Sequence, residues 1–332
     1  MTVQYLSDQV DAEMRDVFST RDMPLYGMMT CHLGWADEQG QPTLSPPRQR
    51  NHGVACLAAN LATGGDGDTA LPAAASVELT NGFAEIHDDV QRGNPKRDGR
   101  DAVWWTWGPA QAINAGDAMH ALARLSLFRL HERGLPAETT FHAIQVLDRA
   151  SLDLCEGRFE DLEAQERIDL SVEAYLRIAS GKTAALYAGA MKLGAMVAGA
   201  GDDVTAALET CGSNVGMAVQ VTNDLKEMWT EADAGPAPEV LNKTKLLPVA
   251  YAFEKANINQ KRRLGDIYFK RVLEKDDVTA LREVLEEIGA RDYSEEVASK
   301  HRDAALAVLD GGVLSADGTD AIRQLLQSLL AD

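Results

Sequence analysis

The sequence lacks the marks of an exported or membrane-spanning protein. Its first twenty residues are acidic and interrupted, without the basic start and apolar run of an export signal. Its four cysteines lie far apart and form no CxxC pair, which predicts reduced thiols and neither a zinc site nor a disulfide framework. The longest apolar stretch, residues 184–200, is broken by Lys192 and several glycines. We therefore expect a cytoplasmic protein without an integral membrane segment.

Positive charge is also scarce. The chain has 32 Lys and Arg residues against 51 Asp and Glu residues, which gives a formal net charge of −19. Such a surface repels a phosphate backbone over most of its area, so we expect no nucleic-acid partner. An anionic substrate would have to be held by local cations or by metal ions.

Alternation of apolar and polar residues with a period of two is rare, which argues against a sheet. Apolar residues instead recur three and four apart over residues 118–130, 170–200 and 204–229. Glycine and proline end the helical patterns near residues 45–47, 64–68, 108–109 and 235–238. With 332 residues, 45% of them hydrophobic, the chain is long enough for a large core. The patterns predict an all-α fold, with residues 1–332 forming a single domain.

Two acidic segments are candidates for metal binding. Glu85, Asp88 and Asp89 fall within about one helical turn, among apolar neighbours. Clustered carboxylates are costly unless a cation lies between them, and their hard oxygens suit Mg²⁺. The alternative is a solvated acidic face. Here the apolar residues among the acids favour the metal.

The second segment has Asn223, Glu227 and Glu231 at intervals of four, so that they share one helix face. A metal-binding edge and an exposed amphipathic edge both fit this pattern. Several residues elsewhere are suited to gripping diphosphate oxygens. They are Arg97, Lys182, Thr183, Lys243 and Lys245.

Ordered matches over residues 32–254 resemble a known family. The matching runs are IHDD at 86–89, WGPAQAINAGD at 107–117, GKTAAL at 181–186 and KLLP at 245–248. They are similar to the trans-isoprenyl diphosphate synthases and the class I terpene synthases that share their fold. The resemblance implies an isoprenoid synthase helical bundle around a deep central cavity, and a homodimer. It also implies two acidic helices that hold three Mg²⁺ ions on an allylic prenyl diphosphate.

Carried over residue by residue, the resemblance implies two sets of ligands. The catalytic and metal-binding set is Asp88, Asp89, Asn223, Asp224 and Glu227, with Glu231 as a further metal ligand. The diphosphate-binding set is Arg97, Lys182, Thr183, Gln220 and Lys245. The second acidic segment also resembles the Asn, Ser, Glu metal triad of terpene cyclases, with Glu227 in the serine place. Whether Glu227 or Glu231 is the distal ligand stays open.

The departures from the family concern the second substrate, isopentenyl diphosphate. Chain-elongating members hold it with a lysine, an arginine, a histidine and a second arginine, which align here with Gln49, His52, Asn81 and Asp98, in that order. Each lost charge-assisted hydrogen bond is worth roughly 1.5–3 kcal/mol, and an aspartate beside a diphosphate repels it. Arg50 is expected to replace part of the lost charge.

Further departures affect the first acidic segment and the apolar cavity. Arg92 stands where the family has its third acid, and Glu85 is the candidate for the missing carboxylate. Phe83 lies five residues before Asp88, where an aromatic side chain resembles a cavity floor for a C15 or C20 substrate. Trp105 is a second candidate cavity residue, suited to stabilising a carbocation with its ring face.

We therefore expect a class I terpene synthase first, a lyase that ionises farnesyl or geranylgeranyl diphosphate and then cyclises it or eliminates a proton. The alternative is a prenyltransferase, acting on isopentenyl diphosphate through a remodelled site or on another acceptor. A third hypothesis is a non-catalytic partner subunit, against which the retained Asp88, Asp89, Lys182 and Gln220 argue. Motifs do not encode the identity of the product.

Overall fold

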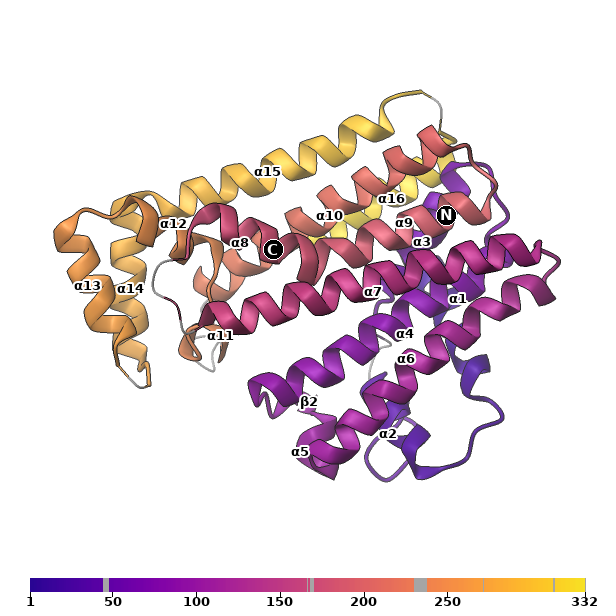
Figure 1. Cartoon of the computed structure of the whole chain (residues 1–332), viewed down its shortest axis with the longest axis horizontal. Helices are drawn as coiled ribbons and strands as arrows, with labels where there is room; N and C mark the ends of the chain where they lie inside the picture. Colours follow the sequence, from indigo (N-terminus) through magenta and orange to yellow (C-terminus); the bar gives the residue numbers. More distant parts are fainter. Residues whose placement is uncertain are drawn as a thin grey trace. The chain divides into compact units, whose positions relative to one another are not determined.

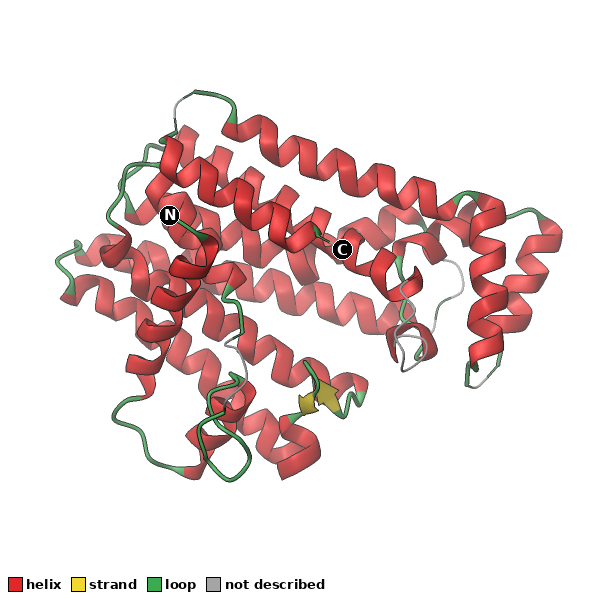
Figure 2. Cartoon of the chain, turned by 180° about the vertical axis from the view of Figure 1, so that it is seen from behind, coloured by secondary structure: helices red, strands yellow, loops and turns green. Residues whose placement is uncertain are grey.

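The fold is built almost entirely of helices. The computed structural model describes residues 1–43, 48–165, 167, 170–229, 238–270, 272–312 and 314–331. Within these ranges the regular elements are helices, apart from two strands of two residues each (Figure 2). The expected all-α class is confirmed. None of the described helices is long and apolar enough to cross a membrane.

The chain divides into two compact units, each assembled from separate segments. Unit 1 comprises residues 1–149, 189–209 and 311–325, and unit 2 comprises residues 150–188, 210–310 and 326–332. Four helices contribute residues to both: α7 (Ala137–Gln165), α9 (Ala185–Val197), α10 (Asp202–Trp229) and α16 (Ala316–Leu330). The expectation of one domain over the whole chain stays a prediction.

Unit 1 is organised around α4 (Gly67–Arg92), which packs along α6 (Pro109–Glu132) (Figure 1). The other helices of this unit's N-terminal part are α1 (Val3–Phe18), α2 (Pro24–His32), α3 (Asn51–Ala62) and α5 (Val103–Trp107). Glycines permit the close approach of α4 and α6, because a Cβ at Gly116 would lie 2.3 Å from His87 Nε2. Similarly, a Cβ at Gly82 would lie 2.5 Å from the Met119 sulfur.

The local sequence explains where α4 begins, how it tolerates a proline and where it ends. The Asp66 side chain accepts from the Asp68 N–H at the N-terminus, and Gly93 takes a left-handed conformation at the C-terminus. Pro72 lies inside the helix and cannot donate to the Asp68 carbonyl four residues earlier. An Arg133 guanidinium N–H donates to that carbonyl instead. The helix therefore runs unbroken to the acidic segment at its end.

A hairpin follows α4, with β1 (Lys96–Arg97) paired antiparallel to β2 (Arg100–Asp101). Its two turn residues, Asp98 and Gly99, have φ values of 50° and 75°. Two positive φ values at an Asp-Gly pair are typical of a type I′ turn. The hairpin returns Arg97 toward the helix that carries Asp88 and Asp89.

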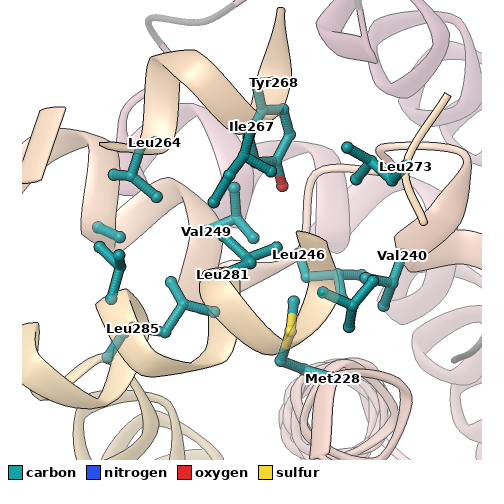
Figure 3. Packing of buried hydrophobic residues seen from close by; sticks show 14 of the residues in the cluster. Met228, Val240, Leu246, Val249, Leu264, Ile267, Tyr268, Leu273, Leu281 and Leu285 are labelled. Carbon is teal, nitrogen blue, oxygen red and sulfur yellow. The ribbon is translucent and has the colours of Figure 1, made fainter. Parts of the chain in front are cut away.

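Unit 2 has an apolar core shared by its helices. Its elements are α8 (Val172–Ala179), the π-helical turn η1 (Ser180–Ala184), α11 (Pro238–Leu241), α12 (Leu247–Lys255), α13 (Ile258–Tyr268), α14 (Lys275–Ile288) and α15 (Ala290–Leu309). Met228 of α10 packs with Leu246, Val249, Leu281 and other buried side chains (Figure 3). This core fixes α12 against α14 and α15. It thereby positions the segment that carries Lys245.

Candidate functional site

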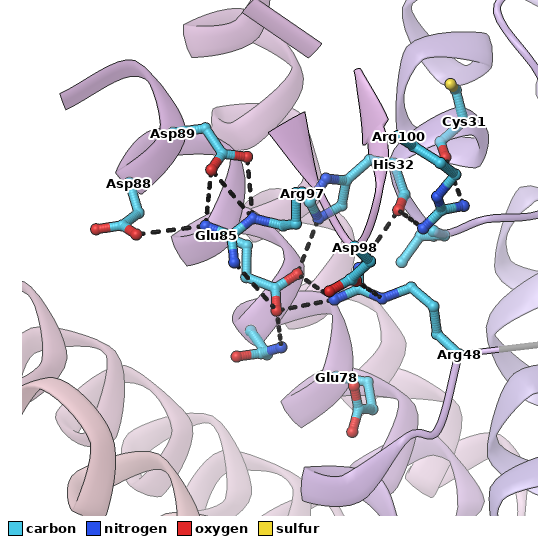
Figure 4. Close-up of polar contacts among 12 residues, drawn as sticks. Cys31, His32, Arg48, Glu78, Glu85, Asp88, Asp89, Arg97, Asp98 and Arg100 are labelled. Carbon is cyan, nitrogen blue, oxygen red and sulfur yellow. Dashed lines mark hydrogen bonds and ion pairs between the residues drawn. The ribbon is translucent and has the colours of Figure 1, made fainter. Parts of the chain in front are cut away.

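The first acidic segment is bound by Arg97 from the hairpin (Figure 4). The Arg97 Nε donates to Asp89 Oδ2 at 2.9 Å, and its Nη2 lies 2.7 Å from Asp89 Oδ1 and 3.3 Å from Asp88 Oδ2. Burial raises the pKa of Asp89, and the bonds from Arg97 offset only part of this rise. The structure thus brings together Asp88, Asp89 and Arg97, three of the residues expected at the allylic diphosphate.

Arg92, which replaces the family's third acid, is also bound to this segment. Its Nε donates to Asp88 Oδ1 at 2.8 Å, one helical turn earlier. Asp88 therefore has a guanidinium at each carboxylate oxygen in this structure. Among the described residues, no group of three or more His, Cys, Asp or Glu side chains is arranged to hold a metal ion by itself.

Glu85, the candidate for the missing carboxylate, is the centre of a buried polar network. Arg48 Nη2 lies 2.9 and 3.0 Å from its two oxygens, His32 Nε2 lies 3.1 Å away, and Asn81 Nδ2 donates at 3.1 Å. Burial by itself would raise the pKa of Glu85, but Arg48, His32 and Arg97 together outweigh burial and hold the pKa well below its usual range. In this structure the charge of Glu85 is therefore used to neutralise Arg48.

A pocket of about 140 Å³ lies beside Glu85. Its walls include Gln49, His52 and Asn81, three of the four positions at which the family's isopentenyl diphosphate ligands are replaced. The fourth, Asp98, accepts from Arg48 Nε at 2.9 Å. The structure thus gathers the substituted positions around one cation, Arg48, which Glu85 and Asp98 already hold.

Arg50 does not replace the lost charge, contrary to expectation. Its side chain is buried at 2% exposure, and its Nε and Nη2 donate to Asp11 Oδ1 at 2.9 and 2.6 Å. Its Nη2 also donates to the Leu33 carbonyl at 2.9 Å. Burial alone would raise the pKa of Asp11, but Arg50 together with the hydrogen bonds from Trp35 and Arg15 outweighs burial and lowers the pKa. Although Arg50 is one of the residues that line the pocket, its guanidinium is already paired with Asp11.

The two expected cavity residues have different surroundings. Phe83 is buried between the rings of His120, stacked at 4.9 Å, and His87, edge-on at 5.0 Å. Trp105 is 59% exposed on the short helix α5, and its expected place in a cavity wall stays a prediction. Its neighbour Trp104 donates from the indole N–H to the Asn94 carbonyl. The two tryptophan rings are in edge-on contact, and Trp105 is the exposed one.

Unit 2 carries Lys182 and Thr183 on the π-helical turn η1. Such turns are rare and often occur at functional sites. Gly157 of α7 faces this turn so closely that a Cβ there would lie 2.3 Å from the Lys182 nitrogen. A Cβ at Gly216 of α10 would similarly lie 2.5 Å from the Ala184 Cα. The turn is thus held between two helices at backbone contact.

Asp224 lies entirely inside unit 2, at 0% exposure. Its Oδ1 accepts from Gln220 Nε2 at 2.7 Å, and its Oδ2 accepts from the Leu247 N–H at 2.7 Å and from the Tyr175 hydroxyl. Burial raises the pKa of Asp224 to about 6, against the lowering influence of Lys182 and these donors. Both carboxylate oxygens are occupied, which differs from the open ligand that the motif suggests.

The remaining expected residues of unit 2 are distributed on the same helix and on the following segment. Asn223 is exposed and Glu227 is half-buried on α10, whereas Glu231 lies outside the described residues. Lys182 Nζ lies 3.3 Å from Asp161 Oδ2. Lys245 is buried with its ammonium 4.5 Å from the centre of the Tyr268 ring. Burial, with a smaller effect of Lys243, lowers the pKa of Lys245 to about 8.

Sequence reasoning missed several residues of these networks, among them Arg48, Asp11 and Tyr175. Arg48 is adjacent to Gln49 in the sequence, and its positive charge beside a substituted ligand position was the signal by which it could have been found. Asp11 and Tyr175 gave none, because their partners lie 39 and 49 positions away in the sequence. Such long-range pairs follow from the fold.

Comparison with known proteins places the chain in a family. The Polyprenyl synthetase family model matches residues 35–287. The chain is 34% identical to a geranylgeranyl diphosphate synthase of Mycobacterium tuberculosis over 94% of this chain and 88% of that one. It is 31% identical to the (2E,6E)-farnesyl diphosphate synthase of the same strain over 90% and 81%.

A solved structure agrees with these relatives. A polyprenyl synthase from Caulobacter crescentus, complexed with calcium and isoprenyl diphosphate, superposes with a TM-score of 0.82 at 26% identity, covering 100% of this chain and 98% of that one. That protein thus binds calcium and an isoprenyl diphosphate. The comparisons favour the prenyltransferase alternative over the cyclisation expected first. The chain belongs to the polyprenyl synthetase family, whose members are all-α prenyltransferase enzymes.

Proposed function

We propose that this enzyme ionises a C15 or C20 allylic diphosphate with the help of Mg²⁺ and transfers the prenyl group to isopentenyl diphosphate. The observation that carries the proposal is the similarity to a geranylgeranyl diphosphate synthase over 94% of the chain. In this reaction the allylic C–O bond breaks, diphosphate departs, a C–C bond forms to the acceptor alkene, and one proton is lost. Phe83 beneath the acidic segment supports the short chain length.

The residues present fit a metal ion bound together with a diphosphate. Asp88 and Asp89 offer hard oxygen donors, which Mg²⁺ prefers, and their charge is balanced here by Arg97. When a diphosphate binds, Arg97 can pair with a diphosphate oxygen instead of with the two aspartates. The aspartate carboxylates would then be available to the metal ion, so every charged group would still have a partner of opposite charge. On unit 2, Asn223 and Glu227 would be the residues that hold a metal ion. Bound metal would stabilise the negative charge on the departing diphosphate.

The chain's own cations have a complementary role. Arg97 and Lys182 bind diphosphate oxygens, and Lys245 adds an ammonium whose surroundings are apolar. Donors in a dry environment stabilise developing negative charge more strongly than donors in water. Each of these cations is suited to holding diphosphate oxygens while the allylic bond breaks.

Cyclisation remains a second candidate because of the pocket beside Glu85. Glu78, Glu85 and Asp98 bring three carboxylates to this region, whereas the arginines among the described residues that line the pocket are Arg48 and the Asp11-bound Arg50. A second diphosphate entering here would have to displace a carboxylate from Arg48. An enzyme that cyclises its allylic substrate needs no such acceptor.

One experiment separates these functions. The purified protein is incubated with Mg²⁺ and farnesyl or geranylgeranyl diphosphate, with and without isopentenyl diphosphate, and products are identified by mass spectrometry. A longer prenyl diphosphate formed only with isopentenyl diphosphate supports the proposal. A hydrocarbon or terpene alcohol formed without it supports cyclisation. No turnover in either case, together with altered product length when a catalytic synthase is added, supports the partner-subunit hypothesis.

The proposal includes a homodimer, as the family resemblance implies. In unit 1, several large apolar side chains of α6 and α7 are exposed in the single chain. They are Ile113, Leu125, Phe128 and Phe141. Burial of such side chains against a second copy would remove them from water at a gain of about 25 cal/mol per Å².

A further inference from the structure

We propose that Asp224 is a positioning residue and not a metal ligand. Its buried carboxylate fixes two segments that carry the diphosphate-binding residues of unit 2, namely the π-helical turn with Lys182 and Thr183 and the start of α12 behind Lys245. This inference rests on the proposed function, because it takes Lys182 and Lys245 to bind the substrate diphosphate.

The first step is the saturation of the carboxylate. Asp224 is fully buried, and three donors converge on its two oxygens. A carboxylate has about four lone-pair positions, so little capacity is left. Magnesium requires oxygens at about 2.0–2.1 Å in near-octahedral geometry and retains several waters. An ion could reach Asp224 only if its donors moved away and water entered. The adjacent Asn223, by contrast, is exposed.

The second step is the link from Asp224 to the π-helical turn. Because the carboxylate accepts, the Gln220 amide must turn its NH₂ group toward Asp224 and its carbonyl oxygen the other way. That oxygen, Oε1, lies 2.5 Å from the Thr183 hydroxyl. A hydroxyl has a single proton, and here it is donated to Gln220. Thr183 therefore contributes by fixing the turn, with its own proton directed inward.

The third step is the link to α12. The Leu247 N–H is one of the first N–H groups of this helix, which have no partner within the helix. Asp224 accepts from it at 2.7 Å, and a negative charge there also complements the helix dipole. Leu247 follows Lys245 by two residues. The same carboxylate oxygen also accepts from Tyr175 of α8, the helix that leads directly into the π-helical turn. One carboxylate thus ties α8, α10, α12 and the turn together.

Packing alone does not supply these links. Gly157 and Gly216 bring α7 and α10 against the backbone of the turn, which limits its displacement. Lys182 is oriented by another buried carboxylate, Asp161. The rotation of the turn and the distance to α12 are set by the polar chain from Thr183 through Gln220 to Asp224 and Leu247.

The decisive comparison is between Asp224→Asn and Asn223→Ala. An asparagine at 224 can accept from Tyr175 and Leu247 with its oxygen, and its NH₂ can donate to Gln220 once the Gln220 amide turns over. We expect Asp224→Asn to keep the Mg²⁺ concentration for half-maximal activity within about threefold of the wild type. Asn223→Ala should raise it about tenfold or more, as the loss of a metal ligand does. A rise for Asp224→Asn as large as that for Asn223→Ala would overturn the proposal.

Tyr175→Phe supplies a second variant that keeps the shape of the core. It removes one donor to Asp224, so we expect KM for the allylic diphosphate to rise about tenfold while kcat changes less and the Mg²⁺ requirement stays the same. Asp224→Ala should show a larger rise of the same kind. An unchanged KM in Tyr175→Phe, with the fold verified by circular dichroism, would contradict the positioning role.

Isothermal titration calorimetry of inorganic pyrophosphate binding in the presence of Mg²⁺ tests this inference separately from the proposed function. A wild-type protein that binds no Mg²⁺-pyrophosphate would overturn the proposed function itself. A wild type that binds, with Asp224→Asn as impaired as Asn223→Ala, would overturn the positioning role alone. Retained binding in Asp224→Asn and weakened binding in Tyr175→Phe is the expected result.

Discussion

At the scale of single residues, Glu85 determines the charge of the pocket in unit 1. It holds Arg48 by two oxygens, accepts from Asn81 and contacts His32. A buried ion pair contributes little when complete, but removal of one partner leaves the other charge uncompensated. The pocket is therefore sensitive to Glu85 and less so to its exposed neighbours.

We predict that Glu85→Gln lowers the free energy of unfolding by about 3 kcal/mol, at the lower end of the range for a broken buried pair because Asp98 still holds Arg48. Urea denaturation at pH 7 measures the change. Glu283→Gln is the matched control, since its pair with Arg263 is exposed, and it should change stability by less than about 1 kcal/mol. Equal effects of the two substitutions would contradict the central place of Glu85.

The same variant has a defined pH dependence. The pKa of Glu85 is lowered in the folded protein, so the unfolded chain binds its proton more readily. Its stabilising contribution is then fully present above the ordinary glutamate pKa of about 4.3 and is lost as the pH falls toward the folded value. The difference in stability between wild type and Glu85→Gln should therefore be constant between pH 6 and 7 and shrink below about pH 4.3. A difference that grows on acidification would refute the assignment.

Asp98 gives a residue-scale test of the acceptor pocket. Asp98→Asn removes the charge yet suits the positive φ of the turn, because asparagine tolerates that conformation. With Arg48 partly released, we expect KM for isopentenyl diphosphate to fall about threefold to tenfold. Combining Asp98→Arg with Gln49→Lys and His52→Arg should strengthen binding further, although arginine strains the turn by roughly 1–2 kcal/mol. No gain in binding in either protein would place the acceptor elsewhere.

From the sequence, the proximity of side chains can be predicted at the residue level where they are neighbours in the chain. Asp88 and Asp89 share a helical turn, so their proximity follows from spacing alone. The roles of Arg50 and Arg48 could not be assigned in this way, because each is decided by an anion many positions away, Asp11 and Glu85. Aspartate at 224 fitted a metal motif by type, but its burial follows from three-dimensional packing.

At the scale of elements, the π-helical turn depends on close backbone contact. A Cβ at Gly157 would lie 2.3 Å from the Lys182 nitrogen and 2.6 Å from the Gly181 carbonyl carbon. Neither backbone atom can move without displacing the turn. The GKT sequence at 181–183 was recognised as a motif, yet periodicity gave no sign of its π-helical shape. That shape arises from the packing of α7 and α10 on either side.

We predict that Gly157→Ala destabilises the protein by about 1–3 kcal/mol through overpacking and raises KM for the allylic diphosphate, because Lys182 is displaced. Thermal unfolding and steady-state kinetics measure both effects. Gly27→Ala is the control, since it lies within α2 with nothing near its Cβ position, and it should be neutral or slightly stabilising. An unchanged KM in Gly157→Ala would show that the turn tolerates the shift.

At the scale of the whole molecule, the helical class followed from the period of the apolar residues, and the relation to prenyl synthases followed from ordered motifs. The division into two contact units made of interleaved segments did not follow, because it depends on which helices pack together. Cyclisation was expected because four positions that bind isopentenyl diphosphate in the family are substituted in this chain. The relatives to which the chain is similar over most of its length are prenyl diphosphate synthases. Local substitutions alone were a weaker guide than similarity over the whole chain.

Assembly is tested at this scale. We predict that Phe128→Glu shifts the protein toward monomer by placing a charge in the apolar surface of α6. Analytical ultracentrifugation of the variant beside the wild type measures the shift. Phe269→Glu, at another exposed phenylalanine in unit 2, should leave the assembly unchanged. A wild type that sediments as a monomer, or a Phe128→Glu variant that remains dimeric, would argue against this surface.

The π-helical turn also limits how this segment can change in length. Its hydrogen bonds span five residues, so it holds one residue more than an ordinary helical turn. Deleting Ser180 would remove the extra residue, so that α8 and α9 could join as one regular helix without a change in the orientation of α8. The turn itself would be lost, and Lys182 and Thr183 within it would be repositioned. Substitutions at the outer face of this segment should therefore be tolerated far better than the loss or gain of a single residue.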